Sequence, residues 1–155
     1  MKQKLQVSFT GTAKGMTDAQ KKTFKKLIIK LDPYSFNHGD CVGSDSEACN
    51  IVYNLRTIII CHPPLNNYKR AFTSADQFRL PKPYLERNKD IVDEGDILIA
   101  TPKGFKEELR SGTWATIRYA KKLGRKICII YPNGDINITE SRYSEGVLKL
   151  RKLRT

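Results

Sequence analysis

The sequence lacks the features that mark several large classes of protein. Its four cysteines, at positions 41, 49, 61 and 128, form no Cys-x-x-Cys pair, so a zinc ribbon and a thioredoxin-type redox motif are excluded. No apolar run approaches the ~20 residues that span a bilayer, and the first residues contain no apolar signal-peptide core. Ten glycines and seven prolines among 155 residues exclude a collagen-like or low-complexity chain. We expect a soluble, cytoplasmic protein of one ordinary domain that makes no membrane contact.

Motifs for the common nucleotide cofactors are missing as well. Neither GxxxxGK[ST] nor GxGxxG occurs, so the sequence gives no specific support to an ordinary ATPase or to an NAD enzyme. The two histidines, His38 and His62, each end a predicted strand, where they either line a site or serve the structure. No cluster has the spacing of metal ligands, and no Ser-His-Asp order is evident. We therefore predict no cofactor and no metal site.

Positive charge is what the sequence has in excess. Lys and Arg number 28 against 16 Asp and Glu, which gives a formal net charge of +12. Such a charge suits nucleic acid, an anionic nucleotide or merely a well-solvated surface, and composition does not choose among them.

Strand-like and helix-like segments alternate along the chain. Five apolar segments predict strands: Leu5–Phe9, Tyr34–His38, Arg56–His62, Asp96–Thr101 and Lys126–Tyr131. Four segments with helical spacing lie between them: Thr17–Leu31, Ser44–Leu55, Pro83–Asp93 and Ser111–Leu123. Thr17–Gln20 and Ser44–Glu47 have the form of capping boxes, residues 65–82 predict a long loop or lid, and Ile136–Ile138 is a candidate short strand. This order predicts an α/β fold with a doubly wound, mainly parallel five-strand sheet and helices on both faces.

Three strand-to-helix loops are expected at one edge of that sheet, where doubly wound folds bind ligands. They are rich in small residues: Thr10–Gly15, Gly39–Ser44 and Arg110–Thr113. Glycine lets the backbone approach an anion closely, and the first N–H groups of a helix favour negative charge. The loops predict a phosphate site; the alternative is that their glycines only make turns.

Polar residues on two predicted helices are candidates for the same site. Arg87 and Asn88 share a face with Tyr84 and Ile91, so Arg87 either binds a ligand phosphate or carboxylate or pairs with a carboxylate such as Glu86 or Asp90. Thr116 is expected to point toward the sheet edge, where its hydroxyl can form a hydrogen bond but cannot act as a carboxylate. Trp114 either stacks on a base or packs in the core.

Four segments together resemble the SLOG superfamily: FTGTAKGMT, HGDCVGSD, ERNKDIVDEGDILIATP and RSGTWATIRYAKKLGRK. That superfamily includes the LOG cytokinin-activating phosphoribohydrolases, DprA-type DNA-processing proteins and nucleotide-sensing domains of bacterial defence systems. The resemblance covers about residues 5–131 and implies a Rossmann-like fold that binds a nucleotide-derived molecule at these loops. It implies a stand-alone SLOG-like domain over residues 1–132, with residues 133–155 as a C-terminal extension that ends in a basic tail and packs on or extends the same domain.

The resemblance also bears on catalysis. Catalytic LOG proteins carry P-G-G-x-G-T-x-x-E after a helix with an E-R-K-type segment. Glu86-Arg87 matches that helix and Gly112-Thr113 matches the G-T, but no Pro-Gly-Gly precedes them and the Glu position is Thr116. Cleavage of an N-glycosidic bond needs a carboxylate, so the sequence favours a protein that binds its ligand without strong catalysis and leaves the catalytic residues unassigned.

We therefore expect sensing or sequestration of a nucleotide-derived small molecule, with a cyclic or ADP-ribose-type signal as a candidate, by a homo-oligomer. The expected ligand-binding residues are Thr10, Gly11, Thr12, Lys14, Gly39, Asp40, Gly43, Ser44, Asp45, Arg87, Asn88, Pro102, Ser111, Gly112, Thr113 and Thr116. One alternative is a nucleoside or nucleotide hydrolase or transferase that uses Asp45, Glu47 or Asp76 in place of the missing Glu. The other is a DprA-like nucleic-acid binder that uses the lysines of Lys21–Lys30 and the tail Lys149–Arg154.

Overall fold

A seven-stranded sheet forms the centre of the protein, as described by a computed structural model for residues 4–139. The strands lie in the order β4-β3-β2-β1-β5-β6-β7. Their bounds are β1 Gln6–Gly11, β2 Ser35–His38, β3 Ile58–Cys61, β4 Gln77–Phe78, β5 Ile97–Thr101, β6 Lys126–Ile130 and β7 Ile136–Thr139. All neighbours pair in parallel except β6 and β7, which pair antiparallel. The sheet is Rossmann-like and mainly parallel, as predicted.

The predicted number of five strands is wrong, because one strand is added at each edge. β4 has two residues, both exposed, so no run of buried apolar residues marks it in the sequence. β7 is the candidate strand of the C-terminal extension, and it completes the sheet by pairing with β6. The division of the chain at residue 132 stays a prediction, and the basic tail from residue 140 on lies outside the described residues.

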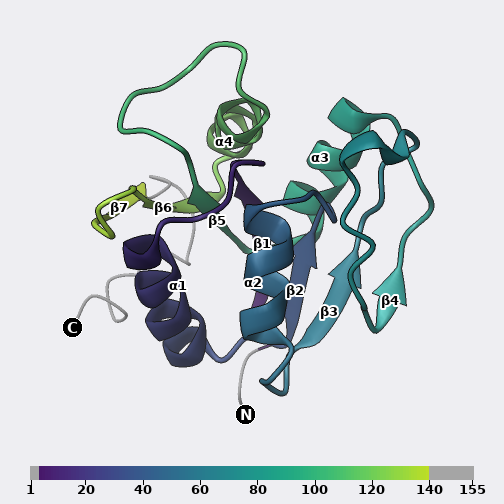
Figure 1. The fold of residues 1–155 in the computed structure, drawn as a ribbon, viewed down its shortest axis with the longest axis horizontal. Coiled ribbons are helices and arrows are strands. Elements are labelled where there is room, and N and C mark those ends of the chain that lie inside the picture. Colours follow the sequence, from purple (N-terminus) through teal and green to yellow (C-terminus); the bar gives the residue numbers. More distant parts are fainter. Residues whose placement is uncertain (1–3, 140–155) are drawn as a thin grey trace.

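Two helices cover each face of the sheet (Figure 1). α1 Asp18–Leu31 and α2 Ser44–Val52 pack on one face, whereas α3 Tyr84–Glu94 and α4 Gly112–Lys122 pack on the other. Alternate residues of β5 serve the two cores: Ile99 joins Phe24 of α1, and Leu98 joins Ile117 of α4. Trp114 is buried in the second core with Leu98. In the described part of the chain, no helix is long and apolar enough to cross a membrane.

The two predicted capping boxes have different outcomes. At α1 the Thr17 hydroxyl accepts from the Gln20 N–H at 3.0 Å, and the Gln20 side chain accepts from the Thr17 N–H at 3.0 Å, so this box is confirmed. At α2 the predicted box is wrong, because the helix begins at Ser44, one residue earlier than a Ser44 cap requires, and Gly43 takes the cap position. The Ser44 hydroxyl instead donates to the Thr12 carbonyl at 2.7 Å, which joins the loops after β1 and β2.

The segment between β3 and α3, residues 62–82, is called the strap below. It contains a short 3-10 turn at Asn67–Lys69 and strand β4, so it is more ordered in structure than the predicted loop. Asp40, at the end of β2, holds the strap: its carboxylate accepts from Arg70 Nε at 2.8 Å and from the Thr73 N–H and hydroxyl. Burial alone would raise the pKa of Asp40, but the hydrogen bonds from Arg70 and Thr73 outweigh it and lower the pKa. The strap therefore runs beside the loop after β2 (Figure 1).

Candidate functional site

A cavity of about 810 Å³ opens at the carboxyl ends of the parallel strands. Its walls come from the loops after β1 and β2, from the strap, from α3, and from the segment between β5 and the first turn of α4. Of the sixteen predicted ligand-binding residues, twelve line it: Thr10, Gly11, Thr12, Lys14, Gly39, Asp45, Arg87, Asn88, Ser111, Gly112, Thr113 and Thr116. The fold thus brings together residues from three predicted loops and two predicted helices.

The other four predicted residues do not line the cavity. Asp40 holds the strap, Gly43 packs against the backbone of Ala13, and Ser44 bonds to the Thr12 carbonyl. The Pro102 carbonyl accepts from Gln20 Nε2 at 2.9 Å and so helps to anchor α1 to the sheet. These residues shape the loops around the cavity, and their role as ligand contacts stays a prediction.

Gly39, Asp45 and Arg87 form what we call the cavity floor. The Asp45 Oδ2 atom accepts from the backbone N–H groups of Gly39 and Cys41, both at 3.1 Å. The Gly39 carbonyl accepts from Arg87 Nη1 at 2.5 Å. A Cβ atom on Gly39 would lie 2.9 Å from the centre of the Arg87 guanidinium group, so a side chain at this position would displace Arg87. One peptide residue therefore positions both charged side chains.

Asp45 is a nearly buried carboxylate, 5% exposed, that lines the cavity. Burial raises its pKa to about 6, although the N–H groups of Cys41 and Gly39 and the nearby Arg87 guanidinium act in the opposite direction. A carboxylate with such a pKa changes its protonation close to neutral pH. Among the described residues that line the cavity, Asp45 is the carboxylate whose pKa burial raises.

Arg87 is 4% exposed and makes no ion pair with Glu86, Asp90 or any other carboxylate among residues 4–139. Its Nη1 atom also donates to the His62 carbonyl at 3.0 Å, and its Nε atom donates to Asn88 Oδ1 at 2.9 Å. The guanidinium lies 4.9 Å from the centre of the Tyr84 ring. Its positive charge is thus held by carbonyl and amide oxygens and by a ring, and it remains available to an anionic or carbonyl group.

The first turn of α4 forms one end of the cavity. The Ser111 hydroxyl caps the helix by accepting from the Trp114 N–H at 3.2 Å, while the N–H groups of Gly112 and Thr113 have no acceptor among the described residues. The Thr116 hydroxyl donates to the Gly112 carbonyl at 2.9 Å, so its proton is used within the helix. Tyr84 lies close above this turn, since a Cβ atom on Gly112 would be 2.2 Å from its hydroxyl oxygen.

Cationic side chains outnumber carboxylates around the cavity. Its lining includes five cations, Lys14, Lys69, Arg87, Lys103 and Arg110, and two carboxylates, Asp45 and Glu108. Lys103 pairs with Glu108 at 3.6 Å, whereas Lys14, Lys69 and Arg110 have no carboxylate partner within residues 4–139. The cavity is therefore positively charged at neutral pH and suits an anionic ligand.

Sequence reasoning missed several of these residues. The strap contributes Asn66, Tyr68 and Lys69, and the segment before α4 contributes Lys103, Glu108 and Arg110. Both segments are polar and without period, so no amphipathic pattern assigns a direction to their side chains. The available signal was the placement of cations and a tyrosine in segments that follow strands β3 and β5.

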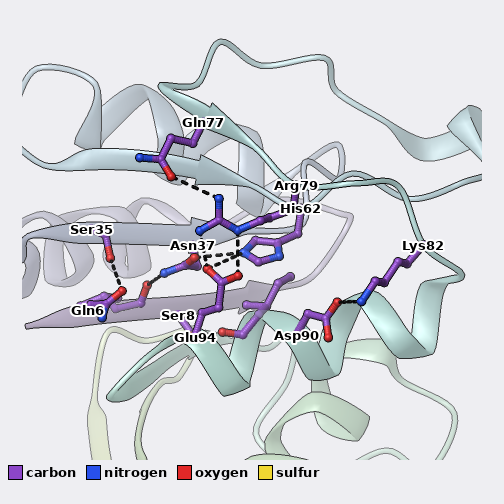
Figure 2. A network of polar contacts seen from close by, with 12 residues as sticks. Gln6, Ser8, Ser35, Asn37, His62, Gln77, Arg79, Lys82, Asp90 and Glu94 are labelled. Carbon is purple, nitrogen blue, oxygen red and sulfur yellow. Dashed lines mark hydrogen bonds and ion pairs between the residues drawn. The ribbon is translucent and has the colours of Figure 1, made fainter.

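Neither histidine lines the cavity, although both end strands at its edge. The His38 Nδ1 atom accepts from the Asp40 N–H at 2.9 Å, and His62 Nε2 lies 3.0 Å from Asn37 Oδ1 (Figure 2). Burial lowers the pKa of each ring to about 4, so both are neutral at physiological pH. The described residues also contain no group of three or more His, Cys, Asp or Glu side chains arranged to hold a metal ion.

Comparisons with known proteins show a shared fold. The sequence matches no protein-family model and no curated protein. The molybdenum cofactor binding protein from the phototrophic bacterium Rippkaea orientalis superposes with a TM-score of 0.68 at 18% identity, and the match covers 98% of each chain. The X-ray structure of the protein TM1055 superposes with a TM-score of 0.60 at 15% identity, over 79% of this chain and 72% of that one. Both matches are consistent with the Rossmann-like fold that the resemblance to SLOG domains implies.

Proposed function

We propose that the protein binds a phosphate-bearing, nucleotide-derived small molecule in the cavity at the strand ends. The observation that carries the proposal is that free helix N–H groups and an excess of cationic side chains surround the same cavity of about 810 Å³. Cavities of roughly 300–1,000 Å³ are typical of small-molecule sites. As a domain of the SLOG type, the protein would sense or sequester this molecule, and a cyclic or ADP-ribose-type nucleotide is a candidate.

The phosphate group is expected at the α4 end of the cavity. The N–H groups of Gly112 and Thr113 point out of the first turn, and the helix dipole favours negative charge there. Lys103 and Arg110 stand on the segment that leads into this turn and line the same cavity. A phosphate at this place would satisfy the two N–H groups and the unpaired Arg110 guanidinium together.

A phosphorylated pterin is the second candidate ligand. The structural match with the molybdenum cofactor binding protein covers 98% of each chain, so the shared fold extends over nearly the whole of both chains. The molybdenum cofactor contains a pterin and a phosphate, and the same helix end and cations suit that phosphate. The cavity chemistry therefore admits either a nucleotide or a pterin phosphate.

Catalysis is a separate candidate function, and the cavity lining bears on which of the named carboxylates could serve it. Of the three carboxylates proposed to replace the missing Glu, only Asp45 lines the cavity. Glu47 accepts from the Met16 N–H and pairs with Lys21, while Asp76 binds the Ile59 N–H at 2.8 Å beside β3. Release of free base from AMP by the wild type but not by Asp45→Asn, with AMP binding retained, would favour a hydrolase.

The test of the proposed function is calorimetric titration with AMP, GMP, ADP-ribose, 7,8-dihydroneopterin monophosphate and ribose 5-phosphate. We expect micromolar binding of at least one, and we expect Arg110→Glu to weaken it at least tenfold because an anion then meets an opposing charge. Lys106→Glu is the matched control, since Lys106 is exposed in the same segment but does not line the cavity.

Mass spectrometry of small molecules released by denaturing the purified protein identifies a ligand retained from the cell. Absence of binding by all five compounds, together with absence of any released phosphate compound, would contradict the proposal. Affinity that ignores Arg110→Glu would show that the phosphate lies elsewhere.

Two further expectations remain proposals. A homo-oligomer is implied by resemblance to LOG-type proteins, and sedimentation of the purified chain measures it. A nucleic-acid partner would use the lysines on α1, such as Lys25 and Lys26, and binding that collapses between about 50 and 200 mM salt would support it. The other basic segment offered for that role, Lys149–Arg154, lies outside the described residues.

A further inference from the structure

The cavity floor presents a hydrogen-bond acceptor and a donor that the fold leaves without partners. Asp45 uses Oδ2 for two backbone N–H groups, and its Oδ1 atom accepts no hydrogen bond from the described residues. Arg87 uses Nε and Nη1, and its Nη2 atom donates none within residues 4–139. Both side chains are at least nine-tenths buried, and both line the cavity. Neither free atom is among the fully enclosed unpartnered atoms of the described residues, so both remain accessible, and a ligand in the cavity that supplies their partners gains affinity.

The two side chains that carry the free atoms are bound to the same residue of the main chain. The Gly39 N–H binds Asp45 and the Gly39 carbonyl binds Arg87, so one residue of the main chain sets the position of both side chains. Asp45 and Arg87 make no direct ion pair, because each is bound to this backbone instead. The floor therefore offers an acceptor and a donor held by the same residue, which suits a ligand edge that carries both a donor and an acceptor.

The surroundings of the floor favour a flat ring. Phe9 of β1 and Ile91 of α3 are nearly fully buried apolar side chains that line the same cavity, and Ile91 lies one turn after Arg87. The Tyr84 ring covers the guanidinium at 4.9 Å. A planar heterocycle has apolar faces for such walls and a polar edge for the floor, whereas a sugar exposes hydroxyls in several directions.

We propose that Asp45 and Arg87 recognise the 2-amino-4-oxopyrimidine edge of the ligand, the edge that guanine and pterins share. The free Oδ1 atom of Asp45 accepts from both the ring N–H and the adjacent amino group, and Arg87 donates to the carbonyl oxygen. This inference rests on the proposed function, because it takes the ligand in this cavity to be a phosphate compound with a heterocycle. An ionised carboxylate accepts and cannot donate, so the xanthine edge, in which a carbonyl replaces the amino group, is disfavoured.

The first experiment compares GMP, 7,8-dihydroneopterin monophosphate, AMP and ribose 5-phosphate by calorimetry at pH 7.5. We expect at least one of the first two to bind tenfold or more tighter than AMP, since a matched pair of base-edge hydrogen bonds discriminates by about 1–3 kcal/mol. A preference for GMP identifies guanine as the source of the edge, and a preference for the pterin identifies the pterin. AMP binding as tightly as both would overturn the inference and leave the proposed function intact. No binding by any of the four would also overturn the inference, and the proposed function would fail with it if ADP-ribose does not bind and no phosphate compound is released from the denatured protein.

Asp45→Asn with xanthosine monophosphate (XMP) is the second experiment. The Asn oxygen keeps the backbone N–H groups of Gly39 and Cys41, so the amide nitrogen takes the place of Oδ1 and becomes a donor. We expect GMP affinity to fall at least tenfold and XMP affinity to rise at least tenfold, a reversal that a general loss of structure cannot produce.

Asp76→Asn is the matched control, because Asp76 also accepts from a backbone N–H but lies outside the cavity lining. It should leave all affinities unchanged. An equal loss of GMP and XMP binding in Asp45→Asn would overturn the proposed role of Asp45, as would a reversal produced by Asp76→Asn.

Discussion

Two clusters of polar side chains both contact His62, and they differ in how completely their charged groups are paired. The closed cluster consists of Asn37, His62, Arg79 and Glu94 (Figure 2). Arg79 forms a two-point pair with Glu94 at 2.8 and 3.0 Å, and its remaining nitrogen donates to Gln77 at 3.1 Å. Every arm of this guanidinium has an acceptor, and both oxygens of the Glu94 carboxylate are used.

The cavity floor is the opposite case. Arg87 is far more buried than Arg79, with 4% of the residue exposed against 39% of the Arg79 side chain, yet it has one unpartnered nitrogen among the described residues. Asp45 is likewise more buried than Glu94 and uses only one oxygen. Folding alone would favour pairing where burial is deepest. The comparison therefore supports our proposal that the charge left unpaired at the floor serves a ligand, while the closed cluster holds β4 and α3 together.

The largest expected effect is a loss of stability at low pH, which would charge the buried His62 ring of the closed cluster and the buried His38 ring. His38 and His62 have a pKa of about 4 in the folded protein and about 6.5 when unfolded, because burial disfavours the charged ring. As the pH falls below 6.5 the unfolded chain binds protons first, so the two histidines together cost on the order of 5 kcal/mol of stability by pH 4.5. Asp45 acts the other way: its raised pKa lets the folded protein bind a proton first, which returns about 2 kcal/mol. We expect a net loss of about 3 kcal/mol between pH 7.5 and 4.5.

Urea unfolding at the two pH values measures this loss. His62→Gln is the control, since it keeps a donor toward Asn37 and removes the titrating ring. It should make the pH dependence shallower by about half of the histidine contribution. Equal stability of the wild type at pH 7.5 and 4.5 would show that the rings are not buried as neutral groups.

Removing each arginine separates the two clusters. Arg87→Ala leaves the buried carbonyls of Gly39 and His62 without a donor, so we expect a loss of roughly 2–3 kcal/mol in unfolding free energy together with loss of ligand binding. Arg79→Ala removes a partly exposed ion pair and should cost about 1 kcal/mol or less, with ligand affinity unchanged. Chemical denaturation and calorimetry on both variants make the comparison. Equal effects of the two substitutions on binding would contradict the distinction between the clusters.

Much of the architecture could be predicted from the sequence because it follows local rules. Apolar segments such as Asp96–Thr101 predicted the strands β1, β2, β3, β5 and β6, and Thr17–Gln20 predicted the start of α1. The two-residue β4 escaped prediction, since Gln77 and Phe78 are both exposed and are paired only because the strap brings them to β3. Strand edges of this kind depend on tertiary contacts that no short pattern contains.

The sequence predicted which loops surround the cavity, but it did not predict the contact that each side chain in them makes. Asp40 lies in the small-residue loop after β2 and Asp45 lies in the first turn of α2, and the sequence alone assigned both to the ligand. Asp40 has a positive φ of 56° and its carboxylate meets Arg70, thirty positions later in the chain, whereas Asp45 turns back to Gly39 and stays beside the cavity. Ser44 likewise became a loop-to-loop contact because the Thr12 carbonyl competes with the helix end for its hydroxyl. Partners far apart in the sequence decided the roles of Asp40 and Ser44, whereas Asp45 kept partners in its own loop.

The last prediction concerns Asp45→Asn, and it sharpens the comparison because the expected change in stability has the opposite sign. A carboxyl whose folded pKa is about 6 and whose unfolded pKa is 3.8 stabilises the protein fully below pH 3.8, and this contribution is lost as the pH rises through 6. At pH 7.5 the buried charge is therefore a cost, and Asn should raise the unfolding free energy by on the order of 1–2 kcal/mol even as it alters ligand binding. Glu94→Gln in the closed cluster should instead lower stability, because it removes a charge that Arg79 uses at both oxygens. Urea unfolding at pH 7.5 compares the two variants, and a loss of stability in Asp45→Asn would mean that the fold itself, and not a ligand, needs the carboxylate at the cavity floor.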